Sequence, residues 1–462
     1  MATDTVPSGA QPLTGVRVIE LGSMYAAPTA GRMLRDFGAD VVKVEDPAAG
    51  DFARQWQPSH NGTAIGFARL NSGKRSVGID LRTPRGRDVV TRLIDEADVL
   101  IENFRPGRLE DWGMGYAALS ARNPRLVMTR VSGFGQTGPY RTRPGFGTVA
   151  ETASGYAFLN GWPDTPPTAP PFGFADSIAG ISAAFGTAMA LYRRELSGHG
   201  SEVDVALYEP LMFILGDAVL NYTSSGTIMQ RHGNSSGAAS PRGIYQASDG
   251  GWLSIAGSNQ AIAMRLFDAM GMPELKTDER YATNTARMAN NEALQEIVRG
   301  WVGSRPRDEI LAVLDEYEVV SAAVNDASDI ARDPHFLQRT LVDLAGSALG
   351  PALMPGPVLH VSDCPRPVYD GVPTVGEHTG DVLAGELGLP ADELTALAAD
   401  GVIGVIGPTN SGAPGNAAAP ATADTAGNPG TAGTAGTAGS AGSAGTAATS
   451  ETSDTVPETG AA

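Results

Sequence analysis

The stretch that decides the fold runs from Val16 to Glu45 and reads VRVIELGSMYAAPTAGRMLRDFGADVVKVE. Two apolar, β-branched runs, 16–22 and 40–45, flank a helix-like segment, 26–37, for which Gly38 is the expected C-terminal stop. This order predicts a strand, a helix and a second strand parallel to the first. Parallel strands are covered on both faces, which agrees with their nearly continuous apolar character.

The same alternation continues along the chain. Further strands are predicted at 76–80, 98–102, 126–131 and 202–206, with a helix over 83–97. Such a pattern is typical of an open, doubly wound, Rossmann-like α/β sheet. The turn after the first strand lacks G-x-G-x-x-G, however, and this argues against nicotinamide or flavin binding.

Composition excludes several classes of function. The chain has 462 residues, enough for two to three domains. It carries 51 acidic and 33 basic side chains, which gives a net charge of -18. This negative charge argues against nucleic acid and anionic membranes as partners. A single cysteine, Cys364, excludes an intramolecular disulfide framework, and no two histidines have metal-ligand spacing. No apolar run approaches the length of a membrane span, so we expect a cytoplasmic protein without a metal site.

Composition and patterning also divide the chain into segments. A helix is predicted over 208–225, and a hairpin over 244–255. The expected segments are a flexible N-terminus (1–12), the N-terminal part of a large α/β domain (13–224), a smaller α+β domain (225–330), a part that returns to the large domain (331–403), and a disordered Ala/Gly/Thr-rich tail (404–462).

Asp176 stands out as a lone acid between a proline-rich approach, which begins at Pro166, and a helix of small residues expected over 177–196. One interpretation is a helix N-cap, the commoner use of aspartate at such a position. The other is a nucleophilic carboxylate, beside a helix whose small side chains let a bulky ligand approach the backbone. The local sequence favours the cap.

Four loops combine glycines with lysine or arginine, and three of them contain an aromatic residue. Cations and backbone N–H groups suit phosphates, and rings or guanidinium groups suit a flat heteroaromatic base. Solvated surface charge is the alternative interpretation of any one of them. The loops are 71–75, 102–108, 132–141 and 143–147.

Taken together, several motifs resemble the class III CoA-transferases, the group that includes formyl-CoA:oxalate and carnitine CoA-transferases. The resemblance extends from about Leu13 to Leu387. It is carried by GADVVKVE at 38–45, NSGKRS at 71–76, ADVLIENFRPG at 97–107, SGFGQTGPY at 132–140, ADSIAG at 175–180 and GEHT at 376–379.

The resemblance implies that Asp176 is the nucleophile and favours that role over a cap. Its carboxylate would form a mixed anhydride with the acyl group and then a thioester with CoA. CoA would enter as part of the acyl-CoA substrate, and no tightly bound cofactor is expected. The family pattern also implies an active-site loop that contains Gly233, Asn234 and Gly237. It places CoA contacts on Tyr25, Ala26, Lys74, Arg75, Asn103 and Phe104.

Two positions depart from the formyl-CoA type, because Asp46 and Asp111 stand where basic residues are expected. Arg105 and Arg108 are the candidates to replace those phosphate contacts. The resemblance further implies a homodimer with interlocked chains, acting on an acyl-CoA and a small carboxylic acid, with a dicarboxylate favoured.

Two alternatives remain open. α-Methylacyl-CoA racemases share the fold and the acid, but they pair it with a histidine where this chain has Phe146. An acid without a second acid/base group is poorly equipped to move a proton between two faces of a carbon. A non-catalytic CoA-binding protein is the other alternative.

Overall fold

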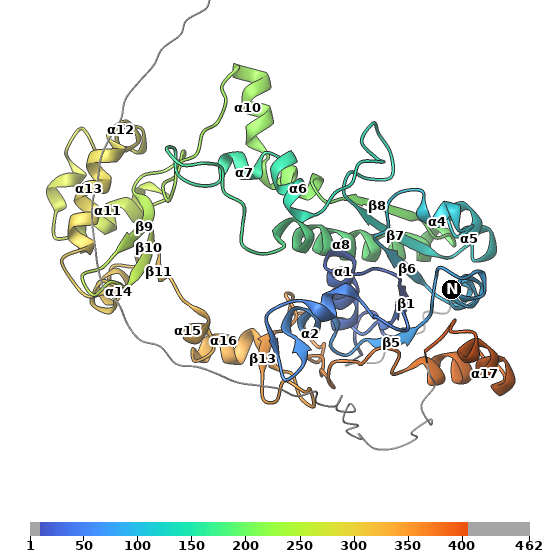
Figure 1. Cartoon of the computed structure of the whole chain (residues 1–462). Helices are drawn as coiled ribbons and strands as arrows, with labels where there is room; N and C mark the ends of the chain where they lie inside the picture. Colours follow the sequence, from blue (N-terminus) through green and yellow to red (C-terminus); the bar gives the residue numbers. More distant parts are fainter. Residues whose placement is uncertain (1–9, 405–462) are drawn as a thin grey trace, which may run out of the picture. The chain divides into compact units, whose positions relative to one another are not determined.

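The structure, a computed structural model, describes residues 10–404. Its centre is a six-stranded parallel sheet of strand order β5-β2-β1-β6-β7-β8, which is the order of a doubly wound fold (Figure 1). This confirms the predicted α/β class with a parallel sheet. The strands are β1 (Arg17–Glu20), β2 (Asp40–Glu45), β5 (Arg75–Gly78), β6 (Val99–Glu102), β7 (Val127–Ser132) and β8 (Glu202–Ala206).

Two helices, α1 (Ala26–Asp36) and α8 (Phe174–Ser197), pack together over one face of the sheet. A Cβ added at Gly180 of α8 would lie 2.5 Å from Cβ of Thr29 and 2.7 Å from the carbonyl oxygen of Ala26. The small residues of α8 thus allow close packing against α1. This corrects the expectation that they form a surface for a ligand.

A second hydrophobic cluster covers the opposite face, where the end of the described chain returns to the sheet. Thr379 accepts the N–H of Gly78 at Oγ1 (2.9 Å), and Ile403 forms a β-bridge with Ile79. The elements that contribute are α3 (Pro84–Asp95), α4 (Arg108–Asp111), α5 (Tyr116–Arg122), the π-helix η3 (Asp381–Glu386) and α17 (Ala391–Ala399).

Residues 242–323 form a three-stranded antiparallel sheet, with helices and a hydrophobic core of their own. The predicted hairpin is present as β9 and β10. The elements are β9 (Arg242–Gln246), β10 (Trp252–Ala256), β11 (Ser321–Ala323), α11 (Gln260–Ala269), η2 (Pro273–Lys276), α12 (Asn284–Ala289), α13 (Asn291–Val302) and α14 (Arg307–Glu316).

The helix predicted over 208–225 is broken at Gly216, which separates α9 (Glu209–Leu215) from α10 (Asp217–Ser225). The predicted tail and most of the predicted flexible N-terminus lie outside the described residues. The remaining elements are short: η1 (Phe52–Gln55), β3 (Ser59–His60), β4 (Thr63–Ala64), α2 (Ile65–Asn71), α6 (Gly147–Ala153), α7 (Tyr156–Leu159), α15 (Ala327–Ile330), α16 (Pro334–Arg339), β12 (Leu341–Asp343) and β13 (Leu353–Pro355).

By length and composition alone, α8 is apolar enough to cross a membrane, with a mean hydropathy of 1.4 over its most apolar 18 residues. No apolar run of that length was expected from the sequence. The extensive contacts of α8 with α1, β7 and β8 are those of a core helix in a doubly wound domain.

Candidate active site

A cavity of about 800 Å³ opens beside Asp176. Its walls come from the turn after β1, helix α2, the segment after β7, the start of α6 and the approach to α8. The residues that line it include Met24, Tyr25, Ala26, Trp56, Arg69, Asn103, Phe146, Gly147, Glu151, Gly173 and Asp176.

Asp176 is the third residue of α8, which begins at Phe174, earlier than predicted. The N-cap is Gly173, and no side chain caps the helix. The cap interpretation of Asp176 is therefore wrong. The carboxylate lies in the first turn, where the helix dipole favours a negative charge.

Glycines surround the carboxylate of Asp176. A Cβ added at Gly147 would lie 2.2 Å from Oδ2 of Asp176, and one added at Gly173 would lie 3.3 Å from the same atom. Backbone atoms therefore approach this carboxylate where any larger residue would place a side chain.

Burial raises the pKa of Asp176 to about 6, and the nearby charge of Glu151 adds to this effect. Glu151 is 2% exposed and accepts the N–H of Ala175 at Oε1 (3.2 Å). Within residues 10–404, no lysine, arginine or histidine forms an ion pair with Asp176. The carboxylate is thus mostly ionised at neutral pH, without a cation to occupy it.

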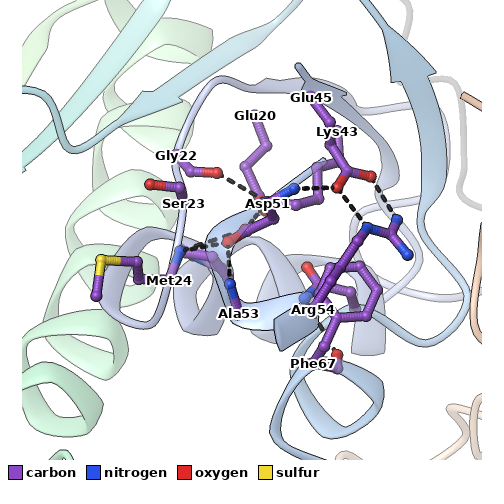
Figure 2. A network of polar contacts seen from close by, with 12 residues as sticks. Glu20, Gly22, Ser23, Met24, Lys43, Glu45, Asp51, Ala53, Arg54 and Phe67 are labelled. Carbon is purple, nitrogen blue, oxygen red and sulfur yellow. Dashed lines mark hydrogen bonds and ion pairs between the residues drawn. The ribbon is translucent and has the colours of Figure 1, made fainter. Parts of the chain in front are cut away.

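A buried network of charges binds the backbone of Gly22 and Met24 in the turn after β1, just before Tyr25 (Figure 2). Nζ of Lys43 contacts Oε1 of Glu20 (2.9 Å), Oδ2 of Asp51 (2.8 Å) and the carbonyl oxygen of Gly22 (2.8 Å). Oδ1 of Asp51 accepts the N–H of Met24 (3.0 Å). Burial lowers the pKa of Lys43, but Glu20, Asp51 and Glu45 outweigh burial and hold that pKa above its usual range.

Lys74 completes this network and is fully buried. Its Nζ donates to Oε2 of Glu20 (2.8 Å), to the carbonyl oxygen of Pro28 (2.9 Å) and to Oδ1 of Asn71 (2.9 Å). All three N–H groups of the ammonium are therefore used within the protein, and the predicted contact between Lys74 and CoA stays a prediction. Burial lowers the pKa of Lys74 to about 8, and the charge of Lys43 adds to this effect, because Glu20 and Asp51 offset only part of it.

Arg75 is engaged elsewhere, by Asp40 and Glu386 on the protein surface. Its guanidinium borders neither cavity described here, so the structure does not bring it to the site. The loop 71–75 precedes β5 instead of following a strand. Arg75 is therefore at the start of β5, away from the carboxyl end of that strand.

A smaller cavity of about 330 Å³ lies at the carboxyl ends of β1, β2, β5 and β6. Phe104 and Trp112 line it in an edge-to-face arrangement with ring centroids 5.4 Å apart. Asp46 also lines it and pairs with Arg82 (2.8 Å). The guanidinium of Arg108 lies 5.5 Å from the Trp112 ring centroid.

The other predicted contacts divide between the two cavities. Tyr25, Ala26 and Asn103 line the larger one, and Phe104 lines the smaller one. Asn103 also fixes the turn after β1, because its amide exchanges two hydrogen bonds with the backbone of Ser23 (3.0 and 2.8 Å).

The remaining candidates line neither cavity. Arg105 and Arg108 are exposed, as is Asp111. In the expected active-site loop, Gly233 donates its N–H to the carbonyl oxygen of Gly161 (2.9 Å). Asn234 and Gly237 are likewise absent from the walls of both cavities.

Sequence reasoning missed Glu151 and Arg69, which line the larger cavity from α6 and α2. One signal for Glu151 in the sequence was a lone acid among the otherwise small residues of the segment 147–155. Across residues 10–404, no cluster of three or more potential metal ligands is found.

Comparison with known proteins agrees with this architecture. The chain matches CoA-transferase family III over residues 13–379. It is 40% identical to succinyl-CoA--D-citramalate CoA-transferase of Chloroflexus aurantiacus, over 85% of this chain and 98% of that protein. It is 35% identical to succinate--glutarate CoA-transferase of Agrobacterium fabrum, over 82% and 96%.

Among solved structures, a CAIB/BAIF family protein from Brucella suis matches with a TM-score of 0.72 and 36% identity, over 81% of this chain and 99% of that chain. The profile, the relatives and the fold therefore agree, and the chain belongs to CoA-transferase family III, as an enzyme that moves CoA between an acyl-CoA and a carboxylic acid.

Proposed function

We propose that Asp176 is the nucleophile that carries CoA between the two acids. The observation that supports this most directly is the carboxylate itself, which has a pKa of about 6, no cationic partner within residues 10–404, and glycine backbone around it at the wall of the large cavity. A carboxylate in this state is ionised at neutral pH and accessible to a thioester carbonyl.

The reaction follows from this chemistry. An oxygen of Asp176 attacks the thioester carbonyl, the C–S bond breaks, and CoA leaves as a thiolate, which gives a mixed anhydride. The thiolate then attacks the aspartyl carbonyl, releases the first acid and forms an Asp176–CoA thioester. The second carboxylate attacks this thioester, the C–S bond breaks to release the thiolate, and a second mixed anhydride forms. The thiolate finally attacks the acyl carbonyl of that anhydride, which gives the new acyl-CoA and frees the Asp176 carboxylate.

Both intermediates must be protected from water, because hydrolysis would destroy the activated acyl group. Each tetrahedral step also needs hydrogen-bond donors for its oxyanion. We expect those donors to be backbone N–H groups, since Gly147 and Gly173 place main chain next to the reacting oxygen.

CoA would extend across both cavities. The pantetheine thiol would enter the large cavity, and the adenine would lie against Phe104 and Trp112 in the smaller one. Asn103 and Ser23, which are hydrogen-bonded to each other, border the larger and the smaller cavity respectively and mark the passage between them. Arg82 and Arg108 are the nearest candidates for the phosphates.

We propose small dicarboxylic acids as the substrate class. The named activities of the relatives involve succinyl-CoA with D-citramalate, and succinate with glutarate. A cavity that excludes long acyl chains and accepts a second negative charge would account for the same preference here.

We also propose an interlocked homodimer, with residues 225–330 as its smaller domain, in the cytoplasm. Support comes from a stripe of exposed apolar side chains on the outer side of α8, at helical spacing: Ile181, Phe185, Met189, Tyr192 and Leu196. A second copy of this chain would cover the stripe.

The test is to incubate the protein with acyl-CoA donors and free acids and to follow new thioesters by mass spectrometry. Asp176→Ala should abolish transfer while CoA still binds, and full turnover by this variant would show that another group is the nucleophile. Deuterium exchange at an α-carbon without exchange between acids would indicate a racemase instead. Within the described chain, no histidine lines the cavity to support that second reaction.

A further inference from the structure

Arg69 is the one basic residue among the described residues that line the large cavity. Most buried or half-buried basic groups around it are paired, as Lys43, Lys74 and Arg54 are with Glu20, Asp51 and Glu45. No carboxylate within residues 10–404 lies within 4 Å of the Arg69 side chain. A half-buried guanidinium thus faces a cavity that also contains two carboxylates, Asp176 and Glu151.

The surroundings of Arg69 fix its direction. It projects from α2, and its Nη2 donates to the hydroxyl of Tyr25, with the guanidinium 5.1 Å from the centroid of the Tyr25 ring. Tyr25 in turn packs beside Trp56, with ring centroids 6.2 Å apart. Arg69 also borders a separate hollow of about 370 Å³ formed with residues 344–355. Tyr25 lines the large cavity and not that hollow.

One phenol ring lies between the guanidinium and the nucleophile. The position of a Cβ added at Gly173 lies 3.2 Å from the Tyr25 ring and 3.3 Å from Oδ2 of Asp176. The Tyr25 ring therefore contacts the Arg69 side chain on one side and lies near Gly173, beside Oδ2 of Asp176, on the other.

The charges lead to the same ligand. Asp176 and Glu151 repel any acid that enters the cavity, and a dianion is repelled more than a monoanion. The guanidinium of Arg69 offsets this repulsion and can bind a carboxylate through two parallel N–H···O bonds. A monocarboxylic acid of equal length would leave that guanidinium without a partner.

We propose that Arg69, held by Tyr25, binds the far carboxylate of a dicarboxylic substrate and thereby selects dicarboxylic over monocarboxylic acids. This inference rests on the proposed role of Asp176 as the CoA carrier. Arg69 is then a specificity-determining residue in the wall of the large cavity.

The experiment separates acceptor binding from donor binding. Wild type and Arg69→Met are loaded with CoA by succinyl-CoA, with longer incubation for the variant, then desalted and mixed with succinate or butyrate. The rate at which the enzyme thioester disappears into succinyl-CoA or butyryl-CoA is measured at several acid concentrations. Arg122→Met, which removes an exposed arginine paired with Asp95, is the matched control.

We expect Arg69→Met to lose about 10- to 150-fold in efficiency with succinate, the range for a hydrogen-bonded charge, and less than about 3-fold with butyrate. Arg69→Lys keeps the charge and should retain part of the preference for succinate, which keeps the test informative if the methionine variant does not fold. The control should match wild type with both acids.

Equal losses with both acids, or weaker CoA binding by Arg69→Met, would assign Arg69 to CoA or to the fold and overturn the inference. Equal use of butyrate and succinate by wild type would overturn it as well. Failure of wild type to form any thioester on Asp176 would instead refute the proposed function.

Discussion

Gly147→Ala tests the geometry around the nucleophile with a single added carbon. The new Cβ would lie 2.2 Å from Oδ2 of Asp176 and 3.1 Å from its Cγ. A carbon–oxygen contact needs about 3.2 Å or more, so Oδ2 must move by about 1 Å. Displacements of this size in a reacting group cost on the order of 100-fold in rate.

The fold should tolerate the same change. Gly147 is the first residue of α6, and its backbone lies outside the left-handed region, so alanine fits its conformation. Replacing glycine by alanine in a helix is favourable by up to about 1 kcal/mol, which offsets part of the strain from turning Asp176. We therefore expect kcat to fall by about 100-fold with little change in the melting temperature.

The assay is acyl-CoA:acid exchange followed by chromatography, with circular dichroism for the fold and calorimetry for CoA binding. Gly300→Ala is the matched control, because Gly300 lies in α13, is exposed and has no atom within 4 Å of the added Cβ. Wild-type kcat in Gly147→Ala would refute the assignment of Asp176 Oδ2 as the reacting oxygen in this position.

Three further predictions concern charge, stability and assembly. Glu151→Gln removes a nearby negative charge and should lower the pKa of Asp176 from about 6. The pH at which kcat falls in acid, where Asp176 becomes protonated, should therefore be lower in the variant than in wild type. An unchanged pH dependence of kcat would contradict this. Lys74→Met should cost about 3 to 5 kcal/mol in urea unfolding, because Glu20 loses a buried partner, while the folded variant still binds CoA; an unchanged stability would argue against the network. Phe185→Glu, on the 68% exposed side chain, should yield monomers in sedimentation velocity if the α8 stripe is covered by a second copy, and persistent dimers would place the interface elsewhere.

The apolar periodicity of the sequence was enough to predict the central sheet. Strand 40–45 was predicted with its observed bounds because most of it is buried and apolar. Strand 202–206, at the edge of the sheet, was predicted with its observed bounds because acidic and apolar residues alternate along it. The charged exceptions within those runs could not be interpreted in the same way. Lys43 and Glu45 are compensated by partners elsewhere in the fold, and periodicity contains no information on such pairs.

The site was predictable where local motifs carried it. Asp176 was identified through its motif, whereas the expected cap failed because the helix begins at Phe174. Lys74 looked like a phosphate ligand in a glycine-rich loop, but that loop enters a strand and buries the ammonium. Glu151 and Arg69 acquire their importance only from tertiary proximity to Asp176 and Tyr25.

The burial of Lys43 and Lys74 also affects whether the enzyme can be acylated by its own substrates. Thioesters and anhydrides acylate unprotonated amines, and the chain contains only three lysines, Lys43, Lys74 and Lys276. The first two are enclosed by carboxylates and carbonyl groups with 0% side-chain exposure, and Lys276 is paired with Asp268. The large cavity presents the guanidinium of Arg69 in their place, and a guanidinium is a poor nucleophile. Among the described residues, the large cavity thus has no lysine at which the activated acyl group could be lost to self-acylation.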